Sequence, residues 1–168
     1  MQARWRDRPT DFLAGDALAR ERDDDDAGFY AAPRLVDHLD RMATRQVEKL
    51  YARLLAKGAR VLDLMTSWKS HLDLAEPGTV AGLGMNAEEL AANPRLAERV
   101  VQDLNRDPRL PWDDASFDAV VCTVSVEYLT RPQAVFAEVR RVLRPGGRFA
   151  LVYSNRYFPP KVVRVWAE

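Results

Sequence analysis

The sequence has little cysteine, no excess of either charge and no long apolar run, and each of these absences excludes a class of protein. Cys122 is the only cysteine among the 168 residues, so an internal disulfide is impossible. Basic and acidic residues number 25 each, which argues against nucleic acid as a partner. No apolar run approaches the roughly 20 residues that cross a bilayer, and the N-terminus lacks the apolar core of a secretory signal. We therefore expect a cytoplasmic protein without a membrane partner.

The composition predicts one globular domain preceded by a polar arm. Hydrophobic residues make up 47% of the chain, which is enough for a packed core. Residues 1–28 are polar and irregular, which predicts a partly mobile arm before a domain of residues 29–168. The run Asp23–Asp26 offers oxygen ligands, but adjacent carboxylates usually form a solvated face, and the run lacks the alternation of a calcium loop. We expect no metal site.

The order of the elements predicts an α/β fold with a Rossmann-like, doubly wound and mostly parallel sheet. Apolar positions three or four residues apart predict a helix over residues 33–55. Further helices are expected after Asn86, an N-cap candidate, and after Thr130, which has capping-box spacing with Gln133. The alternation of strand and helix places helices on both faces of one sheet. Apolar strands are expected over residues 61–64, 79–84, 99–101, 116–124 and 148–153.

The segment after the first strand carries the clearest functional signal. It is predicted to run from a strand that ends near Asp63, through the loop Met65–Ser70, into a helix. Open α/β sheets bind nucleotides at such a strand–loop–helix turn. The loop contains no glycine, although close approach of the backbone to a ligand favours glycine. The absence of a G-x-G-x-x-G pattern also makes a dehydrogenase the weaker interpretation.

Three segments carry a resemblance to a known family. They are Arg60-Val-Leu-Asp-Leu64, Leu110-Pro-Trp-Asp-Asp-Ala-Ser-Phe-Asp-Ala-Val-Val121 and Val142-Leu-Arg-Pro-Gly-Gly-Arg-Phe149. In this order they resemble the first strand, the "LPF-x-D-x-SFD-x-V" run and the "LKPGG" turn of class I S-adenosylmethionine-dependent methyltransferases, in particular the methyltransferase type 11 group. The resemblance covers roughly residues 29–153 and implies S-adenosylmethionine as the methyl donor. A subgroup with a similar glycine-free loop and a "GMN-x-EL" segment also looks like this chain.

The chain departs from the family at three places. The first is the glycine-free loop. The second is Gly84, which stands where the family has an acid that accepts hydrogen bonds from both ribose hydroxyls; losing that contact costs about 1.5–3 kcal/mol. The third is the C-terminus, where the family has two further strands: either the chain is truncated before them or its sheet lacks them. An exposed edge after the fifth strand would favour a homodimer.

The resemblance implies roles for the residues that follow the first strand. Asp63 would lie near the methionine amino group of the donor, or would instead cap the next turn. The hydroxyls of Thr66 and Ser67 suit the methionine carboxylate. Lys69 could pair with that carboxylate or be solvated. Trp68 could pack in the core or fill the space of the methionine end.

The ends of the second and third strands supply the other expected donor contacts. Asn86 could accept one ribose hydroxyl or only cap its helix. Asp103 and Leu104 stand where the family contacts adenine, and loop-surface polarity is the alternative. The full set of expected cofactor-binding residues is Asp63, Met65, Thr66, Ser67, Gly84, Met85, Asn86, Asp103, Leu104, Thr123 and Val124.

The acceptor side is expected after the fourth and fifth strands, although these residues could equally serve local packing and capping. Phe29 and Tyr30 could close over the site as a lid. No catalytic residue is assigned. The acceptor-side candidates are Tyr30, Ser125, Glu127, Tyr128 and Asn155.

The sequence thus predicts methyl transfer from S-adenosylmethionine to a small molecule. The alternative is a non-catalytic protein of the methyltransferase fold that binds the donor weakly or not at all and serves as an interaction or regulatory subunit. The altered loop, Gly84 and the short sheet favour the alternative. Asp63, the Asp103–Leu104 pair and the regular strand pattern favour the enzyme.

Overall fold

The structure is a computed structural model that describes Leu13 and residues 15–167. Its strands are β1 (Arg60–Leu64), β2 (Thr79–Gly84), β3 (Glu98–Val101), β4 (Phe117–Thr123) and β5 (Leu143–Val152). Its helices are α1 (Asp26–Phe29), α2 (Arg41–Leu54), α3 (Ala87–Ala92), the short 3₁₀ helix η1 (Val126–Tyr128), α4 (Pro132–Val142) and α5 (Arg164–Ala167).

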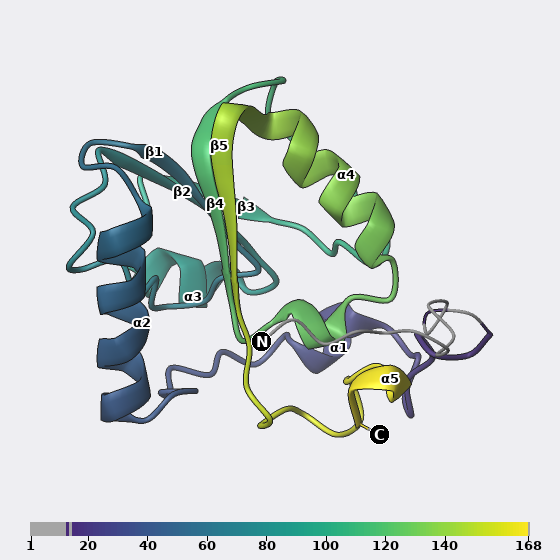
Figure 1. The fold of residues 1–168 in the computed structure, drawn as a ribbon. Helices are drawn as coiled ribbons and strands as arrows, with labels where there is room; N and C mark the ends of the chain where they lie inside the picture. The colour runs from purple at the N-terminus through teal and green to yellow at the C-terminus, as the bar shows by residue number, and fades with distance from the viewer. Residues whose placement is uncertain (1–12, 14, 168) are drawn as a thin grey trace, which may run out of the picture.

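The five strands form one parallel sheet in the order β3-β2-β1-β4-β5. The helices α2 and α3 lie on one side of this sheet and α4 lies on the other (Figure 1). The predicted doubly wound α/β fold is therefore confirmed. In the described part of the chain β5 pairs only with β4, so the predicted dimer through this edge stays a prediction.

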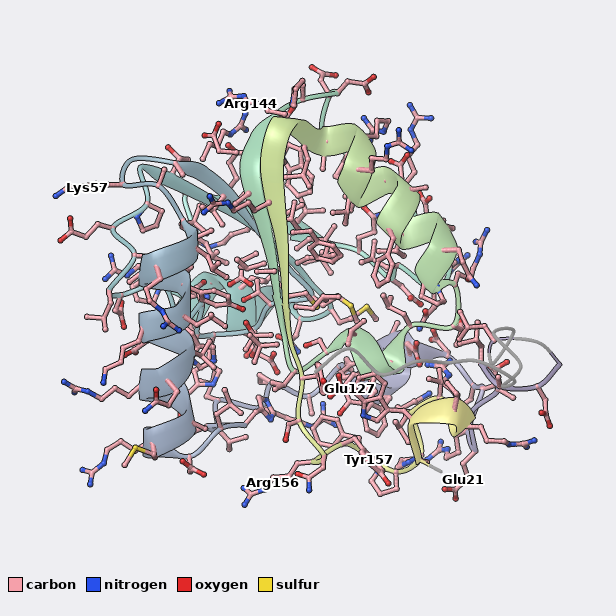
Figure 2. The ribbon with its side chains drawn as sticks, in the orientation of Figure 1. Glu21, Lys57, Glu127, Arg144, Arg156 and Tyr157 are labelled. Atoms are coloured by element: carbon pink, nitrogen blue, oxygen red, sulfur yellow. The ribbon has the colours of Figure 1, made fainter. Side chains whose placement is uncertain are left out.

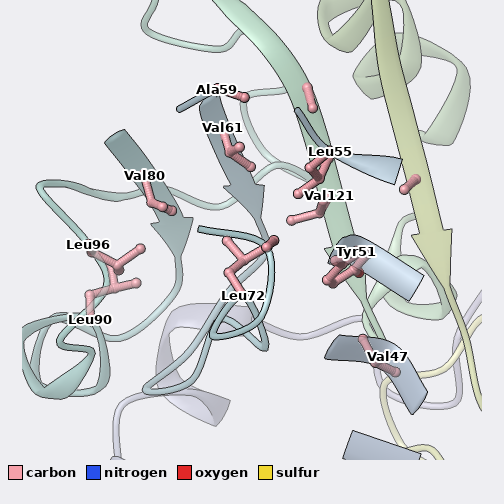
Figure 3. Packing of buried hydrophobic residues seen from close by; sticks show 13 residues of the cluster. Val47, Tyr51, Leu55, Ala59, Val61, Leu72, Val80, Leu90, Leu96 and Val121 are labelled. Atoms are coloured by element: carbon pink, nitrogen blue, oxygen red, sulfur yellow. The ribbon is translucent and has the colours of Figure 1, made fainter. Parts of the chain in front are cut away.

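The sheet separates two hydrophobic cores, because residues alternate between its faces along each strand. One core contains Tyr51 of α2, which lies near Val121, and Leu90 of α3, which lies beside Leu96, as Figure 3 shows. The other core contains strand residues on the opposite face of the sheet, such as Leu62, which pack against α4. Burial on both faces explains why β1, β2 and β4 read as nearly continuous apolar runs.

Three predicted elements differ from the structure. The helix predicted over residues 33–55 begins only at Arg41, where the Asp40 side chain accepts a hydrogen bond from the Ala43 N–H. The helix α4 begins at Pro132, and its N-cap residue Arg131 makes no side-chain capping bond, so the predicted capping box is wrong. The strand β5 already begins at Leu143, which pairs with Phe117; the register shifts across Pro-Gly-Gly, and the pairing resumes between Arg148 and Ala119.

No helix follows β1, which corrects the predicted strand–loop–helix turn. Residues 65–78 instead form turns and irregular backbone. Met65 and His71 both adopt left-handed φ values, 57° and 52°, which interrupt any helical run. Leu72 and Ala75 are nevertheless buried and anchor the segment in the core beside α2. The peptide N–H groups of a helix N-terminus are therefore not available to a ligand at this loop.

The described part of the N-terminal arm is anchored to the C-terminal segment. Arg20 forms an antiparallel bridge with Val163, and the Arg22 N–H donates to the Pro160 carbonyl at 3.0 Å. The rest of the arm that was predicted to be mobile, residues 1–12 and Ala14, lies outside the described residues. In the described residues no helix has the length and hydropathy of a membrane span.

A buried ion cluster joins these two ends of the chain. It consists of Arg20, Asp24, Asp26 and Lys161, with Lys161 Nζ 2.8 Å from Asp24 and 2.9 Å from Asp26, and Arg20 2.8 Å from Asp26. Lys161 is 0% exposed and Asp26 is 5% exposed. The prediction that the aspartate run forms a solvated face is therefore wrong for Asp26. No group of three metal-ligating side chains occurs in the part of the chain that the structure describes.

Candidate functional site

A cavity of about 250 Å³ lies at the carboxyl ends of β1, β2, β4 and β5, beneath residues 26–38. Arg156 and Tyr157, which help to line it, lie at the opposite end of the molecule from Lys57 and Arg144 (Figure 2). Ligands of open α/β sheets bind at this edge, where the strand order reverses. The residues expected at the donor site that line the cavity are Asp63, Met65, Thr66, Ser67, Gly84, Met85, Asp103, Leu104, Thr123 and Val124.

Asp63 places a buried carboxyl group at the end of β1. Asp63 is 2% exposed, and Thr66 Oγ1 donates a hydrogen bond to the Asp63 Oδ2 at 2.7 Å. Burial raises the pKa of Asp63 to about 7, and the hydroxyls of Ser70 and Thr66 offset only part of that rise. No charged side chain of the described residues acts on this carboxyl. Asp63 is therefore suited to a cationic ligand group that enters the cavity.

The glycine-free loop approaches β2 closely because the glycine is on the strand. Met65 takes the left-handed φ of 57° that glycine favours, and the Thr66 N–H donates to the Leu83 carbonyl at 2.8 Å. A β-carbon on Gly84 would overlap the Thr66 carbonyl oxygen and stand 3.1 Å from Leu90 Cδ2. An acid at position 84 is therefore sterically excluded. This conformation of the loop therefore requires glycine at position 84.

We expect Gly84→Ala to lower the free energy of unfolding by about 1–3 kcal/mol, because the overlap with the Thr66 carbonyl forces the loop off β2. Urea denaturation measures the change. Gly28→Ala is the control, because a β-carbon there meets nothing within 4 Å and alanine favours the helix α1. A Gly84→Ala variant as stable as the original chain would contradict this account of the loop.

Asn86 uses its whole side-chain amide within the protein. Its Oδ1 accepts from the N–H groups of Glu88 and Glu89 at 2.9 and 3.1 Å, which caps α3 as predicted. Its Nδ2 donates to the carbonyls of Tyr30 and Ala31 at 2.9 and 3.0 Å. Asn86 is buried and does not line the cavity. We therefore assign it to holding residues 30–38 over the cavity rather than to a ribose hydroxyl.

Residues 30–38, which we call the lid segment, are tied to the loop at two further points. The Trp68 indole N–H donates to the Val36 carbonyl at 2.9 Å. Lys69 forms an ion pair with Asp37, and its ammonium lies 4.3 Å from the centre of the Trp68 ring. Trp68 lines the rim of the cavity and belongs to neither hydrophobic core. The predicted core packing of Trp68 is therefore wrong, and its indole connects the loop to the lid segment at the rim of the cavity.

The end of β3 provides the side of the cavity expected to face adenine. Asp103 lines it, and one of its oxygens accepts from the Asn105 N–H at 2.8 Å. Leu104 is buried and also lines the cavity. The Asn105 amide donates to Asp26 and to the Tyr128 carbonyl, at 3.1 and 2.9 Å. This side of the cavity is therefore connected to the ion cluster.

On the acceptor side the structure separates the candidates. Tyr30, Ser125 and Tyr128 line the cavity, and the Tyr128 ring stacks on Phe158 with centroids 5.9 Å apart. Asn155 is exposed and lies outside the lining. Glu127 also lies outside it, although Figure 2 shows this residue at the same end of the molecule.

Glu127 is fully buried, which removes it from the acceptor side. Neither carboxylate oxygen has a hydrogen-bond partner among the described residues. Burial raises the pKa of Glu127 to about 7. Only its backbone carbonyl is engaged, accepting from the Val163 N–H at 3.0 Å.

The sequence did not predict several of the residues that line the cavity. Glu89 belongs to the helix expected after Asn86, and Asp26 to the run expected to form a solvated face, yet both line the cavity. The imidazole of His71 also lines it, and burial lowers its pKa. Arg34 lines the rim with its guanidinium 4.7 Å from the centre of the Phe29 ring. A search for acids soon after the second strand would have found Glu89.

Comparison with known proteins agrees with this architecture. The family described as "Methyltransferase domain" matches residues 67–151, just over half of the 168-residue chain. The methyltransferase GfsG of Streptomyces halstedii is 33% identical over 137 residues, which are 74% of this chain and 48% of that protein. The chain belongs to this methyltransferase family. The demethylmenaquinone methyltransferase of Beutenbergia cavernae is 38% identical, and the match covers 74% of this chain and 50% of that protein. The chain thus spans about half the length of such relatives.

Solved structures share the fold of this methyltransferase domain. The crystal structure of the PH0226 protein from Pyrococcus horikoshii superposes with a TM-score of 0.59 at 25% identity, covering 71% of this chain and 60% of that one. The cavity of the domain is chemically suited to S-adenosylmethionine. Asp63 offers a buried carboxyl on which no charged side chain of the described residues acts, and the same cavity reaches Asp103.

Proposed function

We propose that this domain binds S-adenosylmethionine and transfers its methyl group to a small-molecule acceptor. The observation that carries the proposal is Asp63, a buried carboxyl that faces the cavity without a cationic partner in the described residues. An ammonium group is the natural complement of such a carboxyl. The family, whose members include proteins named as methyltransferases, supplies the reaction class.

Different residues around the cavity would bind different parts of the donor. When bound, S-adenosylmethionine supplies an electrophilic methyl group. The protein therefore has mainly to position the donor and the acceptor and to exclude water. Asp63 would hold the ammonium group. The hydroxyls of Thr66 and Ser67, which donate to Asp63 Oδ2 and Glu89 Oε2, would fix these two carboxylates rather than bind the methionine carboxylate as predicted. Asp103 and the Leu104 backbone would hold the adenine. Val124, whose φ is 47°, turns the end of β4 into the cavity wall beside them.

The lid segment and the end of β5 would enclose the acceptor. Tyr30, Tyr128 and Phe158 provide apolar ring surface on this side, and Ser125 donates to the Met65 carbonyl at 3.2 Å. A site of ring surfaces with few polar groups is typical of small-molecule binding. We therefore propose a small acceptor with apolar surface rather than a nucleic acid.

We expect S-adenosylhomocysteine to stabilise the full natural protein by about 2.7 kcal/mol at a hundred times its dissociation constant. Thermal unfolding with increasing ligand measures the stabilisation, and calorimetry measures the dissociation constant. ATP, which carries adenosine but no amino-acid end, is the control ligand. Absence of any shift at millimolar S-adenosylhomocysteine would refute donor binding and would favour the non-catalytic interaction or regulatory subunit instead.

A further inference from the structure

The chain lacks the acid at the end of the second strand that nucleotide-binding sheets use for ribose. In such sheets an acid about 20 residues beyond the first strand–loop turn accepts a ribose hydroxyl. Gly84 occupies that place, and the Thr66 carbonyl leaves no room for a side chain on it. A bound nucleoside would therefore need another carboxylate.

Glu89 is an acid in the first turn of α3 that lines the same cavity. Its Oε2 accepts from Ser67 Oγ at 2.7 Å, and its Oε1 accepts from the Arg34 N–H at 2.6 Å. Both of these donors are uncharged. Because an ionised carboxylate has about four acceptor positions, each oxygen keeps capacity for one more hydrogen bond. Two vicinal hydroxyls would supply the two missing donors.

The other acids that line the cavity are engaged differently. Asp26 is held by Arg20 and Lys161, and Asp37 is paired with Lys69. Asp63 is buried at the end of β1, as described above for the ammonium group. Asp103 uses one oxygen to cap the turn after β3. Of the acids that line the cavity, Glu89 lies nearest in sequence to Gly84, and it lines the same cavity as Gly84 and Met85.

We propose that the Glu89 carboxylate replaces the missing strand-end acid and accepts the hydrogen bonds of the donor's ribose hydroxyls. This inference rests on the proposed function. Glu89 also joins the loop, through Ser67, to the lid segment, through Arg34. Binding of the ribose would therefore strengthen the closed arrangement of both, since all three contacts share one carboxylate.

The test compares S-adenosylhomocysteine with its analogue lacking both ribose hydroxyls, by calorimetry on the full natural protein. The original protein is expected to bind S-adenosylhomocysteine about tenfold to a hundredfold more tightly than the analogue. In Glu89→Gln this ratio is expected to fall to within a few-fold of one. Glu88→Gln is the matched control, because Glu88 is its exposed neighbour on α3.

The possible outcomes separate the two proposals. If the original protein binds neither ligand, donor binding and the role of Glu89 are both overturned. If it binds both and Glu89→Gln keeps the full ratio, the role of Glu89 alone is overturned. If Asp103→Asn, and not Glu89→Gln, loses the preference for S-adenosylhomocysteine over the analogue, the ribose contact belongs to Asp103 and the role of Glu89 is overturned. Should Glu89→Gln not fold by circular dichroism, Glu89→Asp, which withdraws the carboxylate by one methylene, decides by the same ratio.

Discussion

Lys161→Ala is expected to lower the free energy of unfolding by about 3 kcal/mol, although Lys161 lies outside the cavity lining. The ammonium has no exposed surface and pairs with Asp24 and Asp26. Its removal leaves Asp26 buried with one cation fewer and opens a cavity where the lysine stem packed. Urea denaturation monitored by circular dichroism measures the loss.

Lys57→Ala is the matched control for this variant. Lys57 pairs with Glu76, but its side chain is 82% exposed, so its loss should change stability far less than the loss of Lys161. Equal effects of the two variants would show that the ion cluster contributes no more than a surface pair.

The same cluster predicts a loss of stability in acid. Burial alone would raise the pKa of Asp26, but hydrogen bonds from Arg20, Lys161 and Asn105 outweigh burial and lower it below the ordinary 3.8. The contribution of Asp26 is therefore present above pH 3.8 and is lost as the pH falls through the lowered pKa.

Binding of S-adenosylmethionine at pH 7 is expected to release about half a proton from Asp63. The free carboxyl has a pKa of about 7 because it is buried, so it is half protonated at that pH. An ammonium group beside it lowers the pKa and favours the ionised form. Affinity should therefore rise as the pH increases through 7. Calorimetry in two buffers of different ionisation enthalpy measures the proton release.

Asp63→Asn tests the assignment of that proton. The variant keeps the shape of the side chain but cannot ionise, so proton release should vanish and affinity should fall about tenfold to a hundredfold. Tyr51 and Cys122, whose pKa values are raised by burial and further by the nearby Asp63 carboxylate, stay neutral at pH 7. Proton release that persists in Asp63→Asn would assign it to a group other than Asp63.

Much of the sheet could be predicted because its signals are local. The strand β2 has the predicted bounds, β1 and β3 begin one residue earlier than predicted, and β4 is one residue shorter at each end. Continuous apolar runs report burial on both faces, which sequence shows directly. The loop after β1 could not be predicted in the same way. Its left-handed turns at Met65 and His71 are held by packing against β2 and the core, which no local pattern records.

The sequence by itself determined the fold class, the family resemblance and the edge of the sheet where the cavity lies, because these follow from the order of strands and from residues adjacent in the chain. Only the tertiary structure decided what Gly84, Glu89 and Asp26 do. Gly84 meets the backbone of Thr66. Glu89 joins two segments that flank the cavity. The ion cluster pairs Asp24 with Lys161, which is 137 residues away. Contacts between residues so distant in the chain depend on how the elements pack, and single-sequence patterns do not encode them.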